Sequence, residues 1–297
     1  MVQKEPSMYI RKILGQNQLM FYGVIAFAIA GLLVGSIEDL EFSFLVASRN
    51  PFAEFCASYG CYLPLCVFPA AGIAIFKGLK KLGKIIPGWI FLVVSYFLAI
   101  YLMQAVSGGA LQNALGNSAD NVVWPVLGSY LIWTALFGWV PPVIYFLLDD
   151  EDPKRLVTLG AAIIIGGLLA YGLTSLFEGL ASRPQYNYLK TLEMPLSEYR
   201  AWWQWAPFSN ADAYHRSFPS SSVTVATFAL GVPSIVAACK KTNQLATNIS
   251  YICVCAYIIG SMYNKVQLGS GFLSDVSFSL LITSALLGIP DYFFQLI

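Results

Sequence analysis

The sequence predicts an all-α protein, a polytopic membrane bundle of about eight transmembrane helices, and three observations point to this class. Only 11% of the 297 residues are charged, against roughly 25% in an ordinary soluble domain. The hydrophobic share is 57%, and the mean hydropathy is +0.65. The apolar residues also gather into stretches of the ~20 residues that cross a bilayer. This composition excludes a disordered chain, a secreted disulfide scaffold and a nucleic-acid-binding protein.

Each apolar stretch is predicted to be a helix, because lipid offers the backbone no hydrogen-bonding partner. In chain order the stretches run over 19–38, 55–76, 85–106, 122–148, 156–180, 222–239, 245–262 and 274–296. The intervening segment 39–54 mixes the charges of Asp39, Glu41 and Arg49 with apolar residues. It is therefore predicted to be an amphipathic or re-entrant segment at the membrane interface.

The chain divides into a cytoplasmic or interfacial N-terminal segment 1–18, N-terminal transmembrane helices 19–155, and a core 156–297 that includes a long polar loop 181–221. Basic residues in the connections favour the cytoplasmic side. With the N-terminus inside, the 17 basic residues divide 11 to 6 in favour of that side. The inner set is Lys4, Arg11, Lys12, Lys77, Lys80, Lys81, Lys84, Lys154, Arg155, Lys240 and Lys241. We expect a plasma or inner membrane protein with both termini cytoplasmic.

The six cysteines lie in or beside apolar stretches and are expected to act as small buried apolar residues. No C-x-x-C pair and no His/Cys cluster has the spacing of a metal site. We therefore expect neither a metal ion nor another cofactor.

Three short polar segments fall on the outer face in this topology, where they are able to converge. They are Ser182-Arg183-Pro184 after the fifth stretch, residues 217–222 (S-F-P-S-S-S) at the start of the sixth, and residues 264–276 before the eighth.

These segments resemble, in order, spacing and flanking text, the motifs of the type 2 phosphatidic acid phosphatase family. Its motifs are K-x6-R-P, P-S-G-H and S-R-x5-H-x3-D, and the family shares its helical core with the vanadium haloperoxidases. The resemblance covers roughly residues 156–297 and implies a fold with that helical core. In the family a histidine attacks phosphorus, an aspartate orients it, and a second histidine protonates the leaving group.

Some family positions are kept in this sequence. Arg183 and Pro184 match the first motif, Pro219 and Ser220 match the second, and Asp275 matches the orienting aspartate of the third. The resemblance implies phosphate contacts from Arg183 and Ser220, with Pro184, Pro219 and Asp275 in orienting or structural roles. Asp275 can equally be a simple N-terminal helix cap.

The reactive positions are replaced. The first-motif lysine falls on Leu176, and the third-motif arginine on Lys265. Ser221 replaces the second-motif glycine, Ser222 replaces the acid histidine, and Gly271 replaces the nucleophilic histidine. Gly271 has no side chain, and a serine hydroxyl does not titrate near neutral pH. We therefore expect no intact catalytic set, while Ser221 and Lys265 remain candidate phosphate-binding residues beside Arg183 and Ser220.

His215 is the single histidine, four residues before Pro219. It is the only candidate to rescue acid or nucleophilic chemistry, and the alternative is an ordinary loop histidine. The loop 181–221 is also rich in tryptophan and tyrosine, which indicates either an interfacial aromatic belt or a lid over an outward-facing site.

Three functions follow from these observations. The first is a phosphatase-like pseudoenzyme, acting as a structural or regulatory subunit of a membrane complex or as a lipid-phosphate binder. Its partners would be other membrane protein subunits and an anionic phospholipid or isoprenoid phosphate. The second is an active lipid-phosphate or polyprenyl-pyrophosphate phosphatase with non-standard residues. The third is a transport-related membrane protein, against which stands the absence of an internal inverted repeat.

Overall fold

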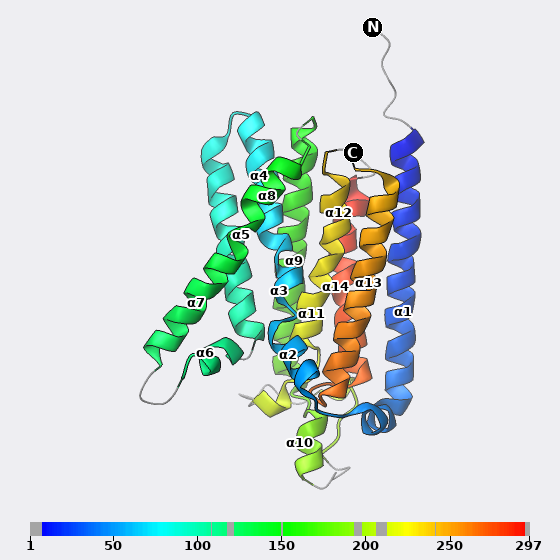
Figure 1. Cartoon of the computed structure of the whole chain (residues 1–297). Helices are drawn as coiled ribbons and strands as arrows, with labels where there is room; N and C mark the ends of the chain where they lie inside the picture. The colour runs from blue at the N-terminus through cyan, green and yellow to red at the C-terminus, as the bar shows by residue number, and fades with distance from the viewer. Residues whose placement is uncertain are drawn as a thin grey trace.

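The computed structural model describes residues 8–107, 109–117, 122–149, 151–192, 198–205, 213–240 and 242–294. These residues form helices and connections, with no β-strand among them (Figure 1). Six helical segments are long and apolar enough to cross a membrane, and two shorter apolar helices cover 221–237 and 273–288. The predicted class, an all-α membrane bundle, is confirmed at this level.

The helices follow the apolar stretches in chain order. The first half contains α1 (Met8–Val46), α2 (Pro51–Tyr59), α3 (Tyr62–Leu65), α4 (Val67–Lys81), α5 (Ile85–Val106), α6 (Ala110–Ala114), α7 (Val123–Phe137) and α8 (Val140–Leu147). The second half contains α9 (Pro153–Ala181), α10 (Tyr186–Thr191), η1 (Ala213–His215), α11 (Ser221–Thr227), η2 (Phe228–Leu230), α12 (Gly231–Ala237), α13 (Gln244–Gln267) and α14 (Leu273–Phe294).

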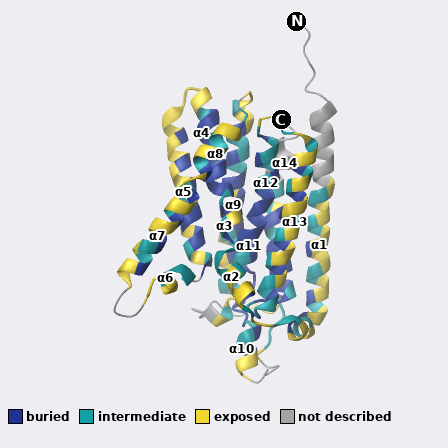
Figure 2. Ribbon diagram, viewed as in Figure 1, coloured by how far each residue is buried: buried dark blue, intermediate teal, exposed yellow. Residues whose placement is uncertain are grey.

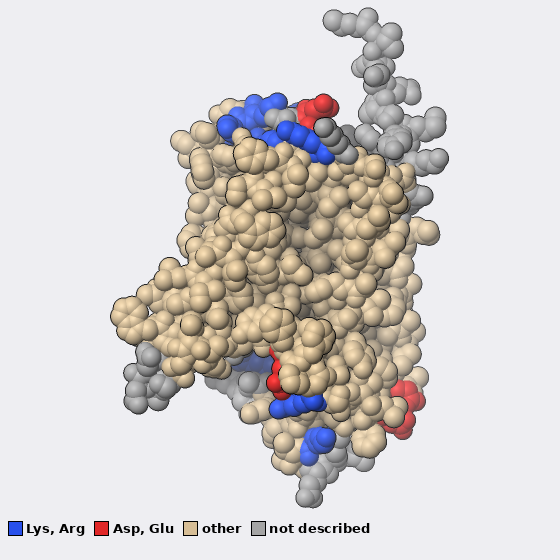
Figure 3. Space-filling model, in the orientation of Figure 1, with Lys and Arg blue, Asp and Glu red and all other residues tan. Residues whose placement is uncertain are grey.

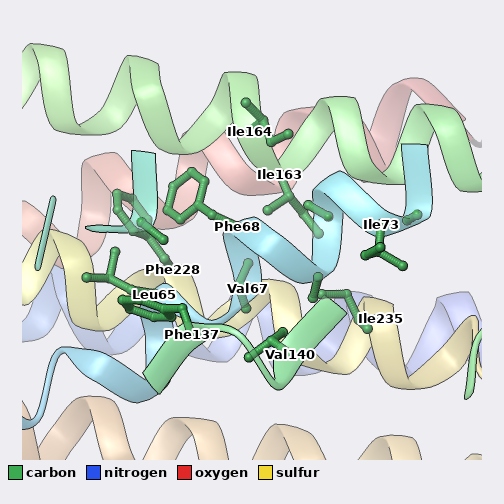
Figure 4. Packing of buried hydrophobic residues seen from close by; sticks show 14 of the residues in the cluster. Leu65, Val67, Phe68, Ile73, Phe137, Val140, Ile163, Ile164, Phe228 and Ile235 are labelled. Carbon is green, nitrogen blue, oxygen red and sulfur yellow. The ribbon is translucent and has the colours of Figure 1, made fainter. Parts of the chain in front are cut away.

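Helix α4 forms the centre of one half of the bundle, between α5 and α9 (Figure 1). Its residues from Val67 to Gly78 are all buried, as the dark colour of this helix shows in Figure 2. Phe68 packs edge-to-face on Phe228, with ring centroids 5.3 Å apart (Figure 4). A membrane helix buried on all sides must be apolar all round, and α4 meets that requirement from Val67 to Phe76.

Helix α1 packs on α14 at the other side of the bundle. Gly35 lies so close to α14 that a Cβ atom there would be 2.6 Å from the backbone nitrogen of Ser274. One turn earlier, Gly31 faces the hydroxyl of Ser277. Small residues four apart allow such close approach of two membrane helices. The absence of side chains at these two glycines therefore sets the α1–α14 distance.

The segment 39–54 was expected at the membrane interface, and the structure differs for its first half. Helix α1 continues without a break to Val46, and Asp39 is 2% exposed inside the bundle. The charge of Asp39 does not end the helix because Arg183 lies opposite it. The second half of the segment does contain a break, and α2 begins at Pro51 with Asn50 as its N-cap.

Three predicted helices are divided in the structure. The stretch 55–76 covers the end of α2, all of α3 and the first part of α4. The stretch 122–148 forms α7 and α8, which meet at Gly138 and Trp139, and Pro141 and Pro142 lie in the first turn of α8. Proline fits the first turn of a helix, where its missing N–H group has no partner to lose. The stretch 222–239 forms α11, η2 and α12 in succession. Figure 1 shows α7 slanting away from the bundle below its junction with α8.

One end of the bundle carries most of the described basic residues, and we call it the Lys77 end. Figure 3 shows a cluster of basic side chains at this end. The end of α4, the connection to α5, the start of α9 and the residues after α12 contribute Lys77, Lys80, Lys81, Lys84, Lys154, Arg155 and Lys240. Lys77 is buried, and its ammonium group donates to the carbonyl oxygens of Leu148 at 2.6 Å and Tyr145 at 3.1 Å. Of the predicted inner set, Lys4 and Lys241 lie outside the described residues. The opposite end, with α2, α6 and α10, is the Arg183 end.

Candidate functional site

The three polar segments singled out in the sequence meet at the Arg183 end. The backbone N–H of Ser217 donates to the carbonyl of Arg183 at 3.1 Å, which joins the first segment to the second. The N–H of Ser220 donates to the carbonyl of Asp275 at 3.4 Å, which joins the second to the third. Pro184 and Pro219 are both buried at these junctions. The segments thus form one polar cluster.

Arg183 lies at the centre of this cluster and is 1% exposed. Its Nε donates to the carbonyl of Arg200 at 2.7 Å. Its Nη1 donates to Ser274 Oγ at 2.7 Å and to Asp275 Oδ1. Its Nη2 donates to Asp39 Oδ2 at 2.9 Å and to the Tyr199 hydroxyl at 3.2 Å. A guanidinium has five N–H donors, so these five acceptors use all of them.

The surroundings keep Arg183 charged despite its burial. Burial disfavours the cation, but the carboxylates of Asp39 and Asp275 contact it directly and stabilise its charge. The guanidinium also lies over the ring of Phe272, 4.2 Å from its centroid. A buried charge is tolerated when it is paired and its hydrogen bonds are satisfied. Arg183 meets both conditions within the chain itself.

Asp275 serves both the ion pair and the start of α14. Its Oδ2 accepts from the backbone N–H of Phe272 at 2.8 Å, immediately before the first helical residue. A carboxylate at the third position of a helix that reaches back in this way satisfies one unpaired N–H of the first turn. The alternative expected from the sequence, a helix-capping role for Asp275, is therefore present together with the contact to Arg183.

The start of α11 forms a second part of the cluster. Ser220 is the N-cap: its hydroxyl accepts from the N–H of Val223 at 3.4 Å and lies 3.2 Å from the Ser222 hydroxyl. The N–H of Ser221 donates to Glu178 Oε1 at 3.2 Å. Unpaired N–H groups at a helix start attract anions. Here the carboxylate of Glu178 already occupies the N–H of Ser221.

Lys265 differs from Arg183 in exposure and in contacts. It is half-buried. A Cβ atom on Gly271 would lie 3.4 Å from its Cγ and 3.5 Å from Asp275 Oδ2, so Lys265 and Asp275 flank the glycine. Lys265 forms no ion pair with a described residue, since both ion pairs between described residues are made by Arg183. The ammonium of Lys265 also makes no hydrogen bond to any described residue. The charges of Glu178 and Asp275 act on it from beyond contact distance.

Two positions from the sequence comparison fall outside this cluster. Leu176 is 51% exposed on α9. The ring of His215 packs on Tyr188 with centroids 4.9 Å apart, and Tyr188 in turn stacks on Tyr214. Ser222 and Gly271 do lie within the cluster. The structure thus brings Arg183, Ser220, Ser221, Lys265 and Asp275 together, and it places His215 in an aromatic contact of the loop.

The sequence reading missed Asp39, Tyr199 and Ser274 as contacts of Arg183. Asp39 gave a signal, because a carboxylate among apolar residues usually has a buried partner. Among the described residues, no group of three or more His, Cys, Asp or Glu side chains is arranged to hold a metal ion. Comparisons of the chain with protein-family models, with curated proteins and with solved structures find no match.

Proposed function

We propose that this chain is a phosphatase-like membrane protein without phosphoryl-transfer chemistry, acting as a structural or regulatory subunit of a membrane complex. Under this proposal the chain is a degenerate member of the type 2 phosphatidic acid phosphatase family. The six long apolar helices and the two shorter ones are then proposed to make eight spans, with the Arg183 end on the outer face. The excess of basic residues at the Lys77 end supports that orientation.

One observation carries the proposal: every N–H donor of Arg183 is used by an acceptor of the chain itself. A guanidinium that binds a phosphoryl group must offer two parallel donors to it. Here Asp39 and Asp275 take the donors that a phosphate would need, and Glu178 takes the N–H of Ser221. The absence of a side chain at Gly271 and the aromatic contact of His215 agree with a lack of turnover.

The test is phosphate release by the purified full chain from phosphatidic acid, diacylglycerol pyrophosphate and a polyprenyl pyrophosphate. We expect none above the level of a matched His215→Ala preparation. Native mass spectrometry of a gentle membrane extract should also show a protein partner in fixed stoichiometry. Turnover that disappears in His215→Ala would refute the proposal and support an active phosphatase with non-standard residues.

A second candidate, binding of a lipid phosphate without turnover, is favoured by Lys265. The residue is half-buried beside Gly271, and its ammonium has no hydrogen-bonding partner among the described residues. An anionic phospholipid or an isoprenoid phosphate offers the acceptors that this group lacks. The discriminating result is an anionic lipid that co-purifies with the wild type and is lost in Lys265→Met, while Lys190→Met, which changes a lysine of α10, retains it.

A further inference from the structure

Helix α1, like the Val123–Leu147 segment, lies at the edge of the bundle with few buried residues. In the most apolar window of α1 only 11% of residues are buried, against 72% in the Pro51–Lys81 segment that contains α4. Figure 2 shows the corresponding exposed colour along α1. Apolar side chains that face lipid gain little from packing on another helix. The position of the Arg183 end of α1 therefore depends on the contacts that its inner face makes.

Those contacts include apolar packing by Leu40, Phe42 and Val46 and a group of polar bonds around Asp39. Asp39 Oδ2 accepts from Arg183 Nη2 at 2.9 Å and from the hydroxyl of Ser274, and Asp39 Oδ1 accepts from the N–H of Ser274 at 2.9 Å. One turn earlier, Ser36 Oγ accepts from Trp202 Nε1 at 2.9 Å. These bonds connect α1 to α14 and to the loop after α9. The Asp39 carboxylate takes part in most of them.

The interface between α1 and α14 lacks interlocking side chains at two glycines of α1, and it contains buried hydroxyls that make no hydrogen bond to a described residue. At Gly31 and Gly35 no side chain of α1 interlocks with α14. The hydroxyl of Ser277, which faces Gly31, is buried and makes no hydrogen bond among the described residues. The same holds for Ser43, which lies one turn beyond Asp39 on the same face of α1. A buried hydroxyl without a partner destabilises the closed arrangement relative to one that admits water or a polar group.

We propose that Asp39 is a latch: its bonds to Arg183 and Ser274 hold the Arg183 end of α1 closed over the polar cluster, and their loss releases this end alone. Release would uncover Ser274, Ser277 and Asp275 from the side of the bundle, opening a lateral passage toward Lys265. The proposal concerns a conformational device in α1. It goes beyond the function proposed above and does not depend on the absence of turnover.

The test is amide hydrogen exchange of the full-length protein in detergent micelles, followed by mass spectrometry of peptides. The latch variant is Asp39→Asn, which keeps the size of the side chain and removes its charge. The matched control is Glu38→Gln, which makes the same change on the adjacent, exposed residue of α1. In Asp39→Asn we expect exchange over residues 36–48 to rise about tenfold or more, as for a local opening. Peptides of α4, α9 and α13, and all peptides of Glu38→Gln, should keep the wild-type rate.

Two results would overturn the latch. One is an unchanged rate over residues 36–48 in Asp39→Asn. The other is an equal rise across α4, α9 and α13, which would mean general destabilisation rather than release of one helix end. If Asp39→Asn does not yield folded protein, Ser274→Ala decides by the same criteria, because it removes the hydroxyl that donates to Asp39 while keeping the ion pair. A smaller rise confined to residues 36–48 supports the latch, and a spread or absent rise rejects it.

Discussion

Arg183 and Lys265 are two cations at the same end of the bundle, and both lie near Asp275, yet they are held in opposite ways. Arg183 is buried, forms two ion pairs and uses every N–H donor within the chain. Lys265 is half-buried and has no hydrogen bond or ion pair from its ammonium to a described residue. The comparison indicates a structural role for the first cation. Any capacity of this end to bind an anion therefore rests on the second.

The largest expected difference is in stability. Arg183→Met leaves Asp39 and Asp275 buried without their cation, and we expect the free energy of unfolding to fall by about 3–5 kcal/mol. Lys265→Met removes a half-buried charge without an ion-pair partner, and the change should stay within about 1 kcal/mol. Denaturant unfolding of the two variants in the same detergent measures both values. Equal losses would remove the distinction between the two cations.

A third cation, Lys77, is expected to have an intermediate effect on the free energy of unfolding. Lys77 is buried like Arg183, but its partners are the carbonyls of Tyr145 and Leu148 at the end of α8 rather than carboxylates. A cation at a helix C-terminus contributes up to about 2 kcal/mol in partly buried sites. Lys77→Met should therefore fall between the other two variants in the same unfolding experiment. A loss as large as that of Arg183→Met would show that burial, rather than pairing with carboxylates, decides the effect.

Gly269 and Gly271, in the connection between α13 and α14, should differ in how much stability is lost when each is replaced by alanine. Gly269 has φ 63° and packs against the side chain of Asn187, whose backbone N–H donates to the Gly269 carbonyl at 2.9 Å. Gly269→Ala should cost at least about 1–2 kcal/mol, because a side chain disfavours this left-handed conformation and its Cβ atom would lie less than 3.0 Å from Asn187 Oδ1. At Gly271 an added Cβ meets only ordinary contacts of 3.4 Å or more. Gly271→Ala should therefore unfold near the wild-type midpoint, and a larger loss than in Gly269→Ala would contradict this packing.

The smallest effect concerns Tyr199 at high pH. Burial raises the pKa of the Tyr199 phenol, although the nearby Arg183 charge acts to lower it. The folded state thus favours the protonated phenol, and this contribution to stability is present below the ordinary tyrosine pKa of about 10 and lost as pH rises above it. The stability difference between the wild type and Tyr199→Phe should shrink above about pH 10. Unfolding midpoints from pH 8 to 11 measure it, and a constant difference would argue against titration of Tyr199.

Local sequence signals predicted an all-α membrane bundle, because apolar length is a property of each segment. They also indicated that residues 182–184, 217–222 and 264–276 are able to meet, since these follow or precede long helices. The partner of Arg183 was missed because Asp39 lies 144 positions away, in a stretch that its charges made look interfacial. Local pattern also gave no sign that α1 would continue past Asp39, because that depends on a tertiary ion pair.

The most direct experiment asks whether inorganic phosphate binds through Arg183. The unfolding midpoints of the wild type and Lys265→Met are measured with phosphate and with chloride at equal ionic strength. A ligand that binds only the folded state raises the midpoint. We expect no phosphate-specific rise in Lys265→Met, although Arg183 is intact, because its donors are already used. A phosphate-specific rise of wild-type size in Lys265→Met would show that Arg183 still accepts an anion and would contradict its structural role.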